Sequence, residues 1–253
     1  MDTIISYNIN GWKPVSSLSY LDKIKTVGKY ILDTYKESLP AVIGLQEMIA
    51  GADAKYLSDL NQALDGNYNI FVPPDFDHLT HHRSIMNVTL VRKDLIVKAV
   101  CPIGSILHNR IFDVVVLIDG QPVHFINYYA VQIQNFRGKA DWYILDRTVK
   151  HEELWRALLL SAETFKDDFV VLLGDLQENS KNGKNILKLS EMGYCEKVAR
   201  FPTLRNDFFC EQSIDHIFYS RKAFELFKPS SFALDGNLLG EVSDHSMLIA
   251  ISA

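Results

Sequence analysis

Residues 170–179 read VVLLGDLQEN, and this short stretch decides how the rest of the chain is interpreted. Four apolar residues lead directly into Gly174, Asp175, Leu176 and Gln177. A run of Val and Leu without alternation is typical of a central strand that is covered on both faces. Functional groups are often carried by loops that a rigid sheet positions. We therefore expect a buried strand that ends in a candidate site.

The composition is that of an ordinary folded protein. The chain has 253 residues, of which 47% are hydrophobic and 23% charged, so we expect one domain spanning 1–253. The formal net charge of -5 provides no overall basic field that would attract nucleic acid. A polyanionic partner would therefore have to meet a local basic patch or a bound metal ion.

The cysteines and the N-terminus bear on the compartment. Cys101, Cys195 and Cys210 form no C-x-x-C pair, which argues against a zinc motif and a disulfide scaffold and favours a reducing, cytoplasmic location. The first residues, MDTIISYNINGW, contain no basic leader, and no apolar run is long enough to span a bilayer. We expect no membrane association and find no sign of an obligate protein partner.

Hydrophobic patterns predict many short strands with a few helices between them. Helical periodicity is clearest over 20–35, 54–64 and 151–165. Strands are predicted at 3–9, 41–47, 67–74, 86–93, 168–176, 214–220 and 246–252, with a hairpin over 112–130 that turns at Asp119-Gly120. This order predicts an α/β (α+β) fold in which two packed, mostly antiparallel sheets carry helices on their outer faces.

Polar side chains of a few kinds follow several of these predicted strands. In chain order they are Asn8 and Asn10 in SYNING, Glu47 in GLQE, Tyr129 in NYYA, Asp175 and Gln177 in GDLQ, Asp215 in SIDHI, and Asp244 and His245 in VSDHSM. A single Asp after a strand usually caps a turn, and a single His is usually structural. The prediction of a site therefore depends on the whole set and its order.

This ordered set resembles the endonuclease/exonuclease/phosphatase superfamily, which has the DNase I-like fold. The resemblance extends from Asn8 to His245, and its most specific motif is VSDHSMLIAI. It implies a four-layer α/β/β/α sandwich and a hydrolase, a phosphodiesterase or nuclease that depends on Mg²⁺ or Mn²⁺. Such chemistry needs an activated water, neutralised phosphate charge and a stabilised leaving oxygen.

The resemblance also implies which residues would hold the metal and activate the water. Glu47 would be a metal ligand, since Mg²⁺ prefers oxygen ligands and needs only one or two carboxylates. Asn10 and Asp244 would complete the surroundings of the metal, directly or through water. Asp175 would orient or deprotonate the attacking water. The pattern is compatible with one or two ions.

The remaining residues would contact the phosphate. His245 would approach it directly, and Asp215 would hold the imidazole in the required tautomer. Hydrogen bonds to the phosphate oxygens would come from Asn8, Tyr129 and Gln177. By a looser match of MNVTLVRK to a strand of the family, Asn87 would lie beside the substrate.

Two positions depart from the family pattern. Gln177 stands where the family has Asn, so its amide extends one methylene farther. Asn10 stands where many members have Asp, so one negative charge is missing near the metal. These departures leave open a protein of the same fold with weakened catalysis that binds nucleic acid or a phosphate ligand.

The resemblance is nearest to the nucleic-acid branches, such as abasic-site endonucleases and tyrosyl-DNA phosphodiesterases. The chain lacks the basic Cys-Asp-Arg segment that phosphoinositide phosphatases carry before Asp215. DNA is therefore the favoured substrate, with endo- or exo-cleavage both open and a small or lipid phosphoester as the alternative.

Several basic residues could contact a phosphate backbone, namely Arg83, Arg92, Lys93, Arg110, Arg137, Lys139 and Arg205. Arg137 is the preferred candidate, because NFRGKADWY places Phe136 and Trp142 near it and aromatic residues beside basic ones suit single-stranded nucleic acid. The histidines of HLTHH, at 78, 81 and 82, lack a clear fourth ligand, and we interpret them as a solvated loop instead of a zinc site.

Overall fold

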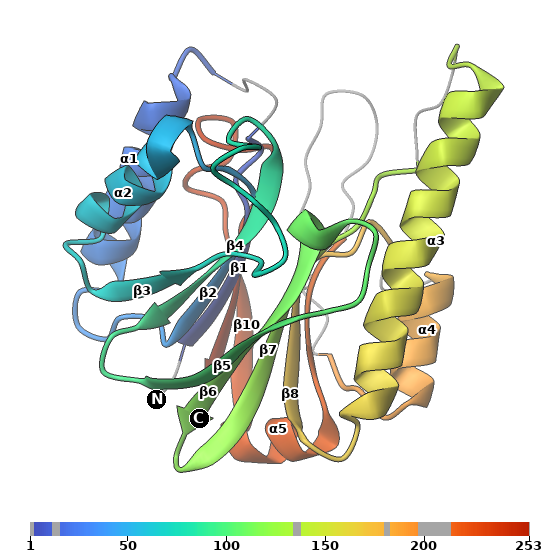
Figure 1. The fold of residues 1–253 in the computed structure, drawn as a ribbon. Coiled ribbons are helices and arrows are strands. Elements are labelled where there is room, and N and C mark those ends of the chain that lie inside the picture. Colours follow the sequence, from blue (N-terminus) through green and yellow to red (C-terminus); the bar gives the residue numbers. More distant parts are fainter. Residues whose placement is uncertain (1–2, 12–15, 134–137, 180–182, 197–213, 253) are drawn as a thin grey trace.

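The computed structural model describes residues 3–11, 16–133, 138–179, 183–196 and 214–252 (Figure 1). Two sheets pack face to face in this part of the chain, and helices cover the outer face of each sheet. The four-layer α/β/β/α arrangement predicted from the sequence is confirmed. None of the helices in the described ranges is long and apolar enough to cross a membrane.

The first sheet has six strands and carries both ends of the described chain. Its strand order is β10 (Pro229–Asp235), β11 (Met247–Ser252), β1 (Thr3–Asn8), β2 (Val42–Ile49), β4 (Ile85–Arg92) and β3 (Tyr68–Phe71). The central strands β1 and β2 are parallel, and all other neighbours in this sheet are antiparallel.

The second sheet has five strands in an order that follows the sequence. They are β5 (Ile96–Pro102), β6 (Ile111–Ile118), β7 (Gln121–Tyr129), β8 (Phe169–Asp175) and β9 (Asp215–Tyr219). The expected hairpin is β6–β7, which turns at Asp119-Gly120. Only β7 and β8 run parallel to each other in this sheet, so a long crossover separates them in sequence.

The helices α1 to α4 form the two outer layers. α1 (Tyr20–Thr34) and α2 (Lys55–Ala63) lie on one side of the molecule, and α3 (Asp141–Thr164) and α4 (Lys184–Glu191) lie on the other side, as Figure 1 shows. α5 (Arg221–Phe227) follows β9, and the short 3₁₀ turns η1 (Ala52–Ala54) and η2 (His108–Arg110) precede α2 and β6.

Three apolar layers hold the sandwich together. Val42, Phe125 and Leu173 represent the cluster between the two sheets. The cluster under α1 and α2 includes Ile24, Val27 and Ile31 from the apolar face that the sequence predicts for α1. The cluster under α3 and α4 includes Leu154, Leu158 and Leu189. Burial on both faces explains why the central strands are apolar throughout.

Candidate active site

The strand ends that carry the predicted site residues meet at one end of the two sheets. β1 and β2 are parallel and pair Asn8 with Gln46, so Asn8 at the end of β1 lies beside Glu47 near the end of β2. In the second sheet, Asp175 pairs in register with Tyr129 on β7 and with Asp215 on β9. The topology therefore gathers residues that are far apart in the sequence.

Three residues at these strand ends adopt a left-handed backbone conformation. The φ angles are 52° at Asn10, 59° at Glu47 and 54° at Gln177. Such conformations are uncommon outside glycine and cluster at functional sites, where they cost on the order of 1–3 kcal/mol each. Their coincidence at one end of the molecule is an independent reason to regard this region as functional.

Two glycines allow the backbone to approach closely here. A Cβ atom on Gly174 would lie 1.8 Å from the carbonyl oxygen of Tyr128, and the φ angle of Gly174 is +148°. A Cβ atom on Gly11 would lie 2.1 Å from the carbonyl oxygen of Glu47. These glycines let Asp175 and Glu47 sit close to the neighbouring chain segments.

A chain of hydrogen bonds joins the two parts of the site. Nδ2 of Asn8 donates to Oε1 of Glu47 at 3.1 Å and to Oδ2 of Asp175 at 3.0 Å, so one amide bridges the two sheets. The backbone N–H of Asn10 donates to Oδ1 of Asn8 at 2.9 Å, and Nδ2 of Asn10 donates to Oδ1 of Asp244 at 2.6 Å. Asn8, Asn10, Glu47, Asp175 and Asp244 thus form one network.

Tyr129 closes this network from the side of β7. Its hydroxyl donates to Oε1 of Glu47 at 2.6 Å, and the guanidinium carbon of Arg110 lies 4.3 Å from the centre of its ring. Burial, together with the charge of Glu47, raises the pKa of Tyr129 well above its ordinary value of about 10. The hydroxyl therefore stays protonated and remains a donor.

His245 is held by Asp215. Nδ1 of His245 lies 2.8 Å from Oδ2 of Asp215, and its Nε2 lies 3.9 Å from Oδ2 of Asp175. Burial opposes the charged imidazole, but the carboxylate of Asp215 outweighs it and raises the pKa of His245 to about 10. Ser243, which sequence reasoning missed, accepts the backbone N–H of His245 at 3.1 Å and donates to the carbonyl of Asn8 at 2.6 Å.

Asp175 is buried at the centre of the site. Burial raises its pKa to about 7, and the charge of Asp215 adds to this effect, while His245 and the amides of Asn8 and Gln177 oppose it. Nε2 of Gln177 donates to Oδ2 of Asp175 at 2.7 Å. A carboxylate with a pKa near neutrality is suited to exchange a proton with a substrate or a water.

Comparisons with known proteins show which solved structures this chain is similar to. No protein-family profile and no curated protein sequence matches the chain. D. rerio TDP2 complexed with single strand DNA product aligns over 98% of this chain and 97% of its own, with a TM-score of 0.66 and 17% identity. An AP endonuclease from Archaeoglobus fulgidus aligns over 100% of this chain and 99% of its own, with a TM-score of 0.70 and 16% identity. An endonuclease/exonuclease/phosphatase family protein from Leptotrichia buccalis C-1013-b covers 100% of both chains at a TM-score of 0.67 and 14% identity.

The chain has the DNase I-like fold. The resemblance to the endonuclease/exonuclease/phosphatase superfamily that the sequence predicts is confirmed for the architecture, and two of the named neighbours come from the nucleic-acid branches that it favoured. At 14–17% identity these likenesses concern the fold, so the chemistry of this chain must be argued from its own residues.

One group of possible metal ligands in the described ranges consists of Asp175, Asp215 and His245, whose ligand atoms lie within 4.8 Å of one another. The hydrogen bond between His245 and Asp215 already uses one nitrogen and one oxygen of this group. Mg²⁺ prefers oxygen ligands and retains several waters. This group therefore suits proton handling better than a magnesium ion.

Glu47, Asn10 and Asp244 form a second, oxygen-rich set that hydrogen bonds link through Asn8. Lys23 of α1 is buried beside it, and its Nζ donates to the carbonyl of Asn10 at 3.3 Å. Burial lowers the pKa of Lys23, and the nearby carboxylates of Asp244 and Glu47 partly offset this shift. Within the described residues, the hydrogen bonds of Glu47 and Asp244 engage Oε1 and Oδ1, so the second oxygen of each carboxylate suits a hard divalent cation.

Sequence reasoning missed Lys23, although a signal was present. Lys23 precedes Ile24 and lies four residues before Val27 on the buried face of α1. A lysine on the apolar side of a helix is rarely fully buried unless a partner compensates for its charge. That position could have pointed to an acidic site beneath α1.

Asn87 and Arg137, the two predicted substrate contacts, have different outcomes. Asn87 is fully buried on β4, and its Nδ2 donates to the carbonyls of Arg110 at 2.7 Å and Asn127 at 3.0 Å. It therefore holds the backbone at Arg110 and Asn127 in place, and a direct contact with a substrate stays a prediction. Arg137 lies outside the described residues, as does Arg205.

The histidines of HLTHH are not part of the ligand group found in the described ranges. His81 is exposed and its ring stacks on Phe76 at 5.8 Å between the ring centres.

The side chains predicted to donate to the phosphate donate to carboxylates in this structure. These side chains are Asn8, Tyr129 and Gln177, and the acceptors are Glu47 and Asp175.

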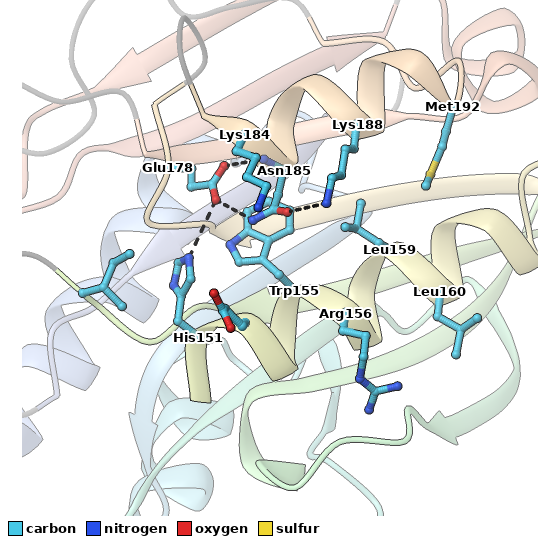
Figure 2. Close-up of a pocket in the computed structure, with 12 residues that line it drawn as sticks. His151, Trp155, Arg156, Leu159, Leu160, Glu178, Lys184, Asn185, Lys188 and Met192 are labelled. Carbon is cyan, nitrogen blue, oxygen red and sulfur yellow. Dashed lines mark hydrogen bonds and ion pairs between the residues drawn. The ribbon is translucent and has the colours of Figure 1, made fainter. Parts of the chain in front are cut away.

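A hollow of about 760 Å³ lies between α3 and α4, outside the candidate active site (Figure 2). None of the predicted site residues lines it. Figure 2 shows Glu178 pointing at Asn185 and His151, and its Oε2 accepts the backbone N–H of Asn185 at 2.8 Å. Glu178 thus anchors the start of α4 to the loop that follows Asp175.

Proposed function

We propose that this protein is a divalent-metal-dependent phosphodiesterase that hydrolyses DNA. The observation that carries this proposal is the position of Asp175. Its carboxylate is buried, receives hydrogen bonds from Asn8 and Gln177, and lies 3.9 Å from Nε2 of His245. A carboxylate held in this way beside an imidazole can activate a water against a phosphodiester.

In this proposal Asp175 takes a proton from the attacking water. The water oxygen forms the new bond to phosphorus, the bond to the leaving oxygen breaks, and that oxygen then gains a proton from solvent. His245 donates a hydrogen bond from Nε2 to a phosphate oxygen, because Asp215 occupies its Nδ1. Asn8 fixes the direction of the Asp175 carboxylate from the first sheet.

Mg²⁺ or Mn²⁺ would be held by Glu47, Asp244 and Asn10. When bound, such an ion neutralises phosphate charge and stabilises the leaving oxygen. Tyr129 positions the Glu47 carboxylate through the hydrogen bond at 2.6 Å. Asn10 keeps Asp244 in place through the hydrogen bond at 2.6 Å, so Glu47 and Asp244 supply the negative charge of this set.

The DNA substrate is supported by charge and by the structural neighbours. Arg110 lies directly over the ring of Tyr129, so a cation flanks the candidate site on the side of β7. The TDP2 structure named above contains a single strand DNA product, and the Archaeoglobus fulgidus protein is described as an AP endonuclease. Arg137 and Asn87 remain proposed substrate contacts.

A binding protein of the same fold with weakened catalysis is the second candidate. The observation that favours it is the hydrogen bond from Nε2 of Gln177 to Asp175 at 2.7 Å. An amide that folds back on the carboxylate is not directed at a phosphate. A small or lipid phosphoester is the alternative substrate class.

A substrate panel tests the proposal. Purified protein is incubated with single-stranded, double-stranded, abasic-site and 3′-phosphorylated DNA and with a small phosphomonoester, in Mg²⁺, in Mn²⁺ and in EDTA. We expect metal-dependent cleavage of at least one DNA. Cleavage of the small phosphoester alone would contradict the DNA assignment, and binding without any turnover would support the second candidate.

A further inference from the structure

A groove of about 280 Å³ lies beside the candidate active site, between η2 and the first turns of α3. Its polar lining includes Asn109, Arg110, Tyr143, Asp146, Arg147 and Lys150. Three of these residues are cations and one is an anion, so the groove is locally positive on a chain whose net charge is -5. A local excess of this kind needs a reason of its own.

The two arginines are attached to the segment that leaves Tyr129. Nη1 of Arg110 donates to the carbonyl of Ala130 at 3.2 Å, and Nε of Arg147 donates to the carbonyl of Gln132 at 3.0 Å. Each contact uses one nitrogen of a guanidinium that has five N–H donors. These carbonyls fix the direction of both side chains, and in the part of the chain that the structure describes, other N–H donors of each guanidinium are available to a ligand.

The groove continues directly from the candidate active site. Arg110 lies over the ring of Tyr129, whose hydroxyl binds the Glu47 carboxylate at the proposed metal set. Arg147 is anchored to the carbonyl of Gln132, which lies two residues after Ala130 on the same segment. A chain of phosphates that has one phosphate at the site would therefore meet Arg110 and then Arg147.

The groove also offers an aromatic ring. Tyr143 lines it beside the two arginines, and Nζ of Lys139 lies 5.6 Å from the centre of the Tyr143 ring. A ring next to arginines allows a base to stack while the neighbouring phosphate is bound. Bases of a duplex are already stacked on each other, so this combination suits an unpaired strand.

We propose that this groove binds the part of an unpaired DNA strand that flanks the scissile phosphate, with Arg110 and Arg147 on successive phosphates and Tyr143 against a base. The inference rests on the proposed function, because it takes the phosphate at the site as the start of the path. It adds a binding site and a preference for unpaired over double-stranded DNA.

Binding in EDTA tests the groove separately from catalysis. The probe is a fluorescein-labelled oligothymidylate of about 12 nucleotides, within the range that single-strand-binding sites cover, and anisotropy gives its Kd at several salt concentrations. We expect Arg147→Gln to weaken binding about 5- to 10-fold and to reduce the salt slope by about 0.7, the value for one phosphate contact on a single strand. Arg221→Gln is the matched control, since Arg221 is an exposed arginine of α5 that pairs with Glu225 at 3.3 Å.

Three further variants at two positions extend the test. Lys150→Gln removes a cation whose Nζ contacts Asp146 at 2.8 Å, and we expect it to weaken binding at least about 3-fold through the lost phosphate attraction. Tyr143→Ala should weaken binding about 5-fold or more, whereas Tyr143→Phe, which retains the ring, should bind like the parent. Circular dichroism of each variant verifies that it is folded.

The outcomes separate the groove from the proposed function. If both Arg147→Gln and Lys150→Gln bind the oligothymidylate like the parent, the proposed role of the groove in binding DNA is wrong, even if the protein cleaves DNA. Tighter binding of a duplex of equal length than of the single strand would overturn the preference for an unpaired strand. Weaker binding by these variants in a protein that cleaves no DNA would support the groove and contradict the nuclease proposal.

Discussion

Nδ1 of His245 lies 2.8 Å from Oδ2 of Asp215, although 30 positions separate the two residues in the sequence. Asp215 begins β9 of the second sheet, and His245 precedes β11 of the first sheet. The contact therefore joins the two sheets at the candidate site. It also leaves Nε2 of His245 directed towards Asp175, at 3.9 Å from its Oδ2.

Removal of this imidazole should impair turnover more than binding. We expect His245→Ala to lower kcat about 10²-fold or more, because its contact matters most as charge develops on the phosphate in the transition state. Asp215→Asn should reproduce much of this loss, since Asn cannot hold the imidazole as a carboxylate does. Steady-state kinetics on a cleaved DNA substrate measure both, and a near-parental kcat for His245→Ala would show that the residue is structural.

The amide at position 177 tests whether catalysis is weakened in this protein. Gln177→Asn shortens the side chain by one methylene and should free the amide from Asp175, to which it now donates at 2.7 Å. Asn also tolerates the left-handed backbone at this position, where φ is 54°. If the second candidate function is correct, an inactive parent gives an active variant, with a gain of about 10-fold or more for one phosphate contact. Equal and substantial rates of parent and variant would remove that alternative.

Glu178 should matter for the stability of α4. Its carboxylate accepts the backbone N–H of Asn185 at 2.8 Å and Nδ2 of the same residue at 2.6 Å. We expect Glu178→Ala to lower the free energy of unfolding by about 1–2 kcal/mol, as for the loss of a helix cap. Urea unfolding measures the change, and Glu191→Ala, at an exposed position at the end of the same helix, should stay within about 0.5 kcal/mol of the parent. Equal effects of the two variants would contradict this role.

His124 predicts a pH dependence of stability away from the candidate site. Its hydrogen bond to Asp113, at 2.6 Å, raises the pKa of His124, and burial only partly opposes the shift. Because the folded pKa is raised, this contribution is fully present below the unfolded value of about 6.5 and is lost as the pH rises through the folded value.

The variant that tests this linkage is His124→Gln. We expect it to be destabilised by about 1 kcal/mol near pH 5.5, and by progressively less as the pH rises through the folded pKa, in urea unfolding at a series of pH values. Asp113→Asn should abolish the same pH-dependent contribution to stability. Adding His124→Gln to Asp113→Asn should therefore cause no further pH-dependent loss of stability. A difference that is constant or grows with pH would contradict the pair.

The sequence predicts the architecture because its central strands have strong signals. The apolar runs that become β2, β8 and β11 are short and rich in Val, Ile and Leu, which favours buried strands, and the helix that becomes α1 has a clear apolar face. The convergence of Asn8, Glu47, Asp175 and His245 follows from the resemblance, since only the known fold says which strand ends meet.

The elements that were not predicted have weak local signals. β5 lies at an edge and is mostly half-exposed or exposed, so its pattern lacks a continuous apolar run. α4 and α5 are short, with 8 and 7 residues, and depend on tertiary anchors such as Glu178. The start of α3 at Asp141, ten residues before the predicted helix, exposes Trp142 and Leu145 and so has no apolar face towards the core.

Details of the site were also beyond sequence reasoning. No local pattern indicates that Gln177 donates to Asp175 or that Asn87 is buried and donates to the carbonyl of Arg110. Both facts depend on side-chain directions that tertiary packing sets.

The rate of DNA cleavage by Asp175→Asn tests the central claim most directly. The substitution keeps the shape of a side chain that is fully buried, but it removes the carboxylate that would accept the proton of the attacking water. On the DNA that the parent cleaves in Mg²⁺, we expect kcat to fall by about 10³-fold or more while Kd in EDTA changes by less than about 3-fold. A variant that cleaves DNA at the parental rate would contradict the assignment of Asp175 as the general base.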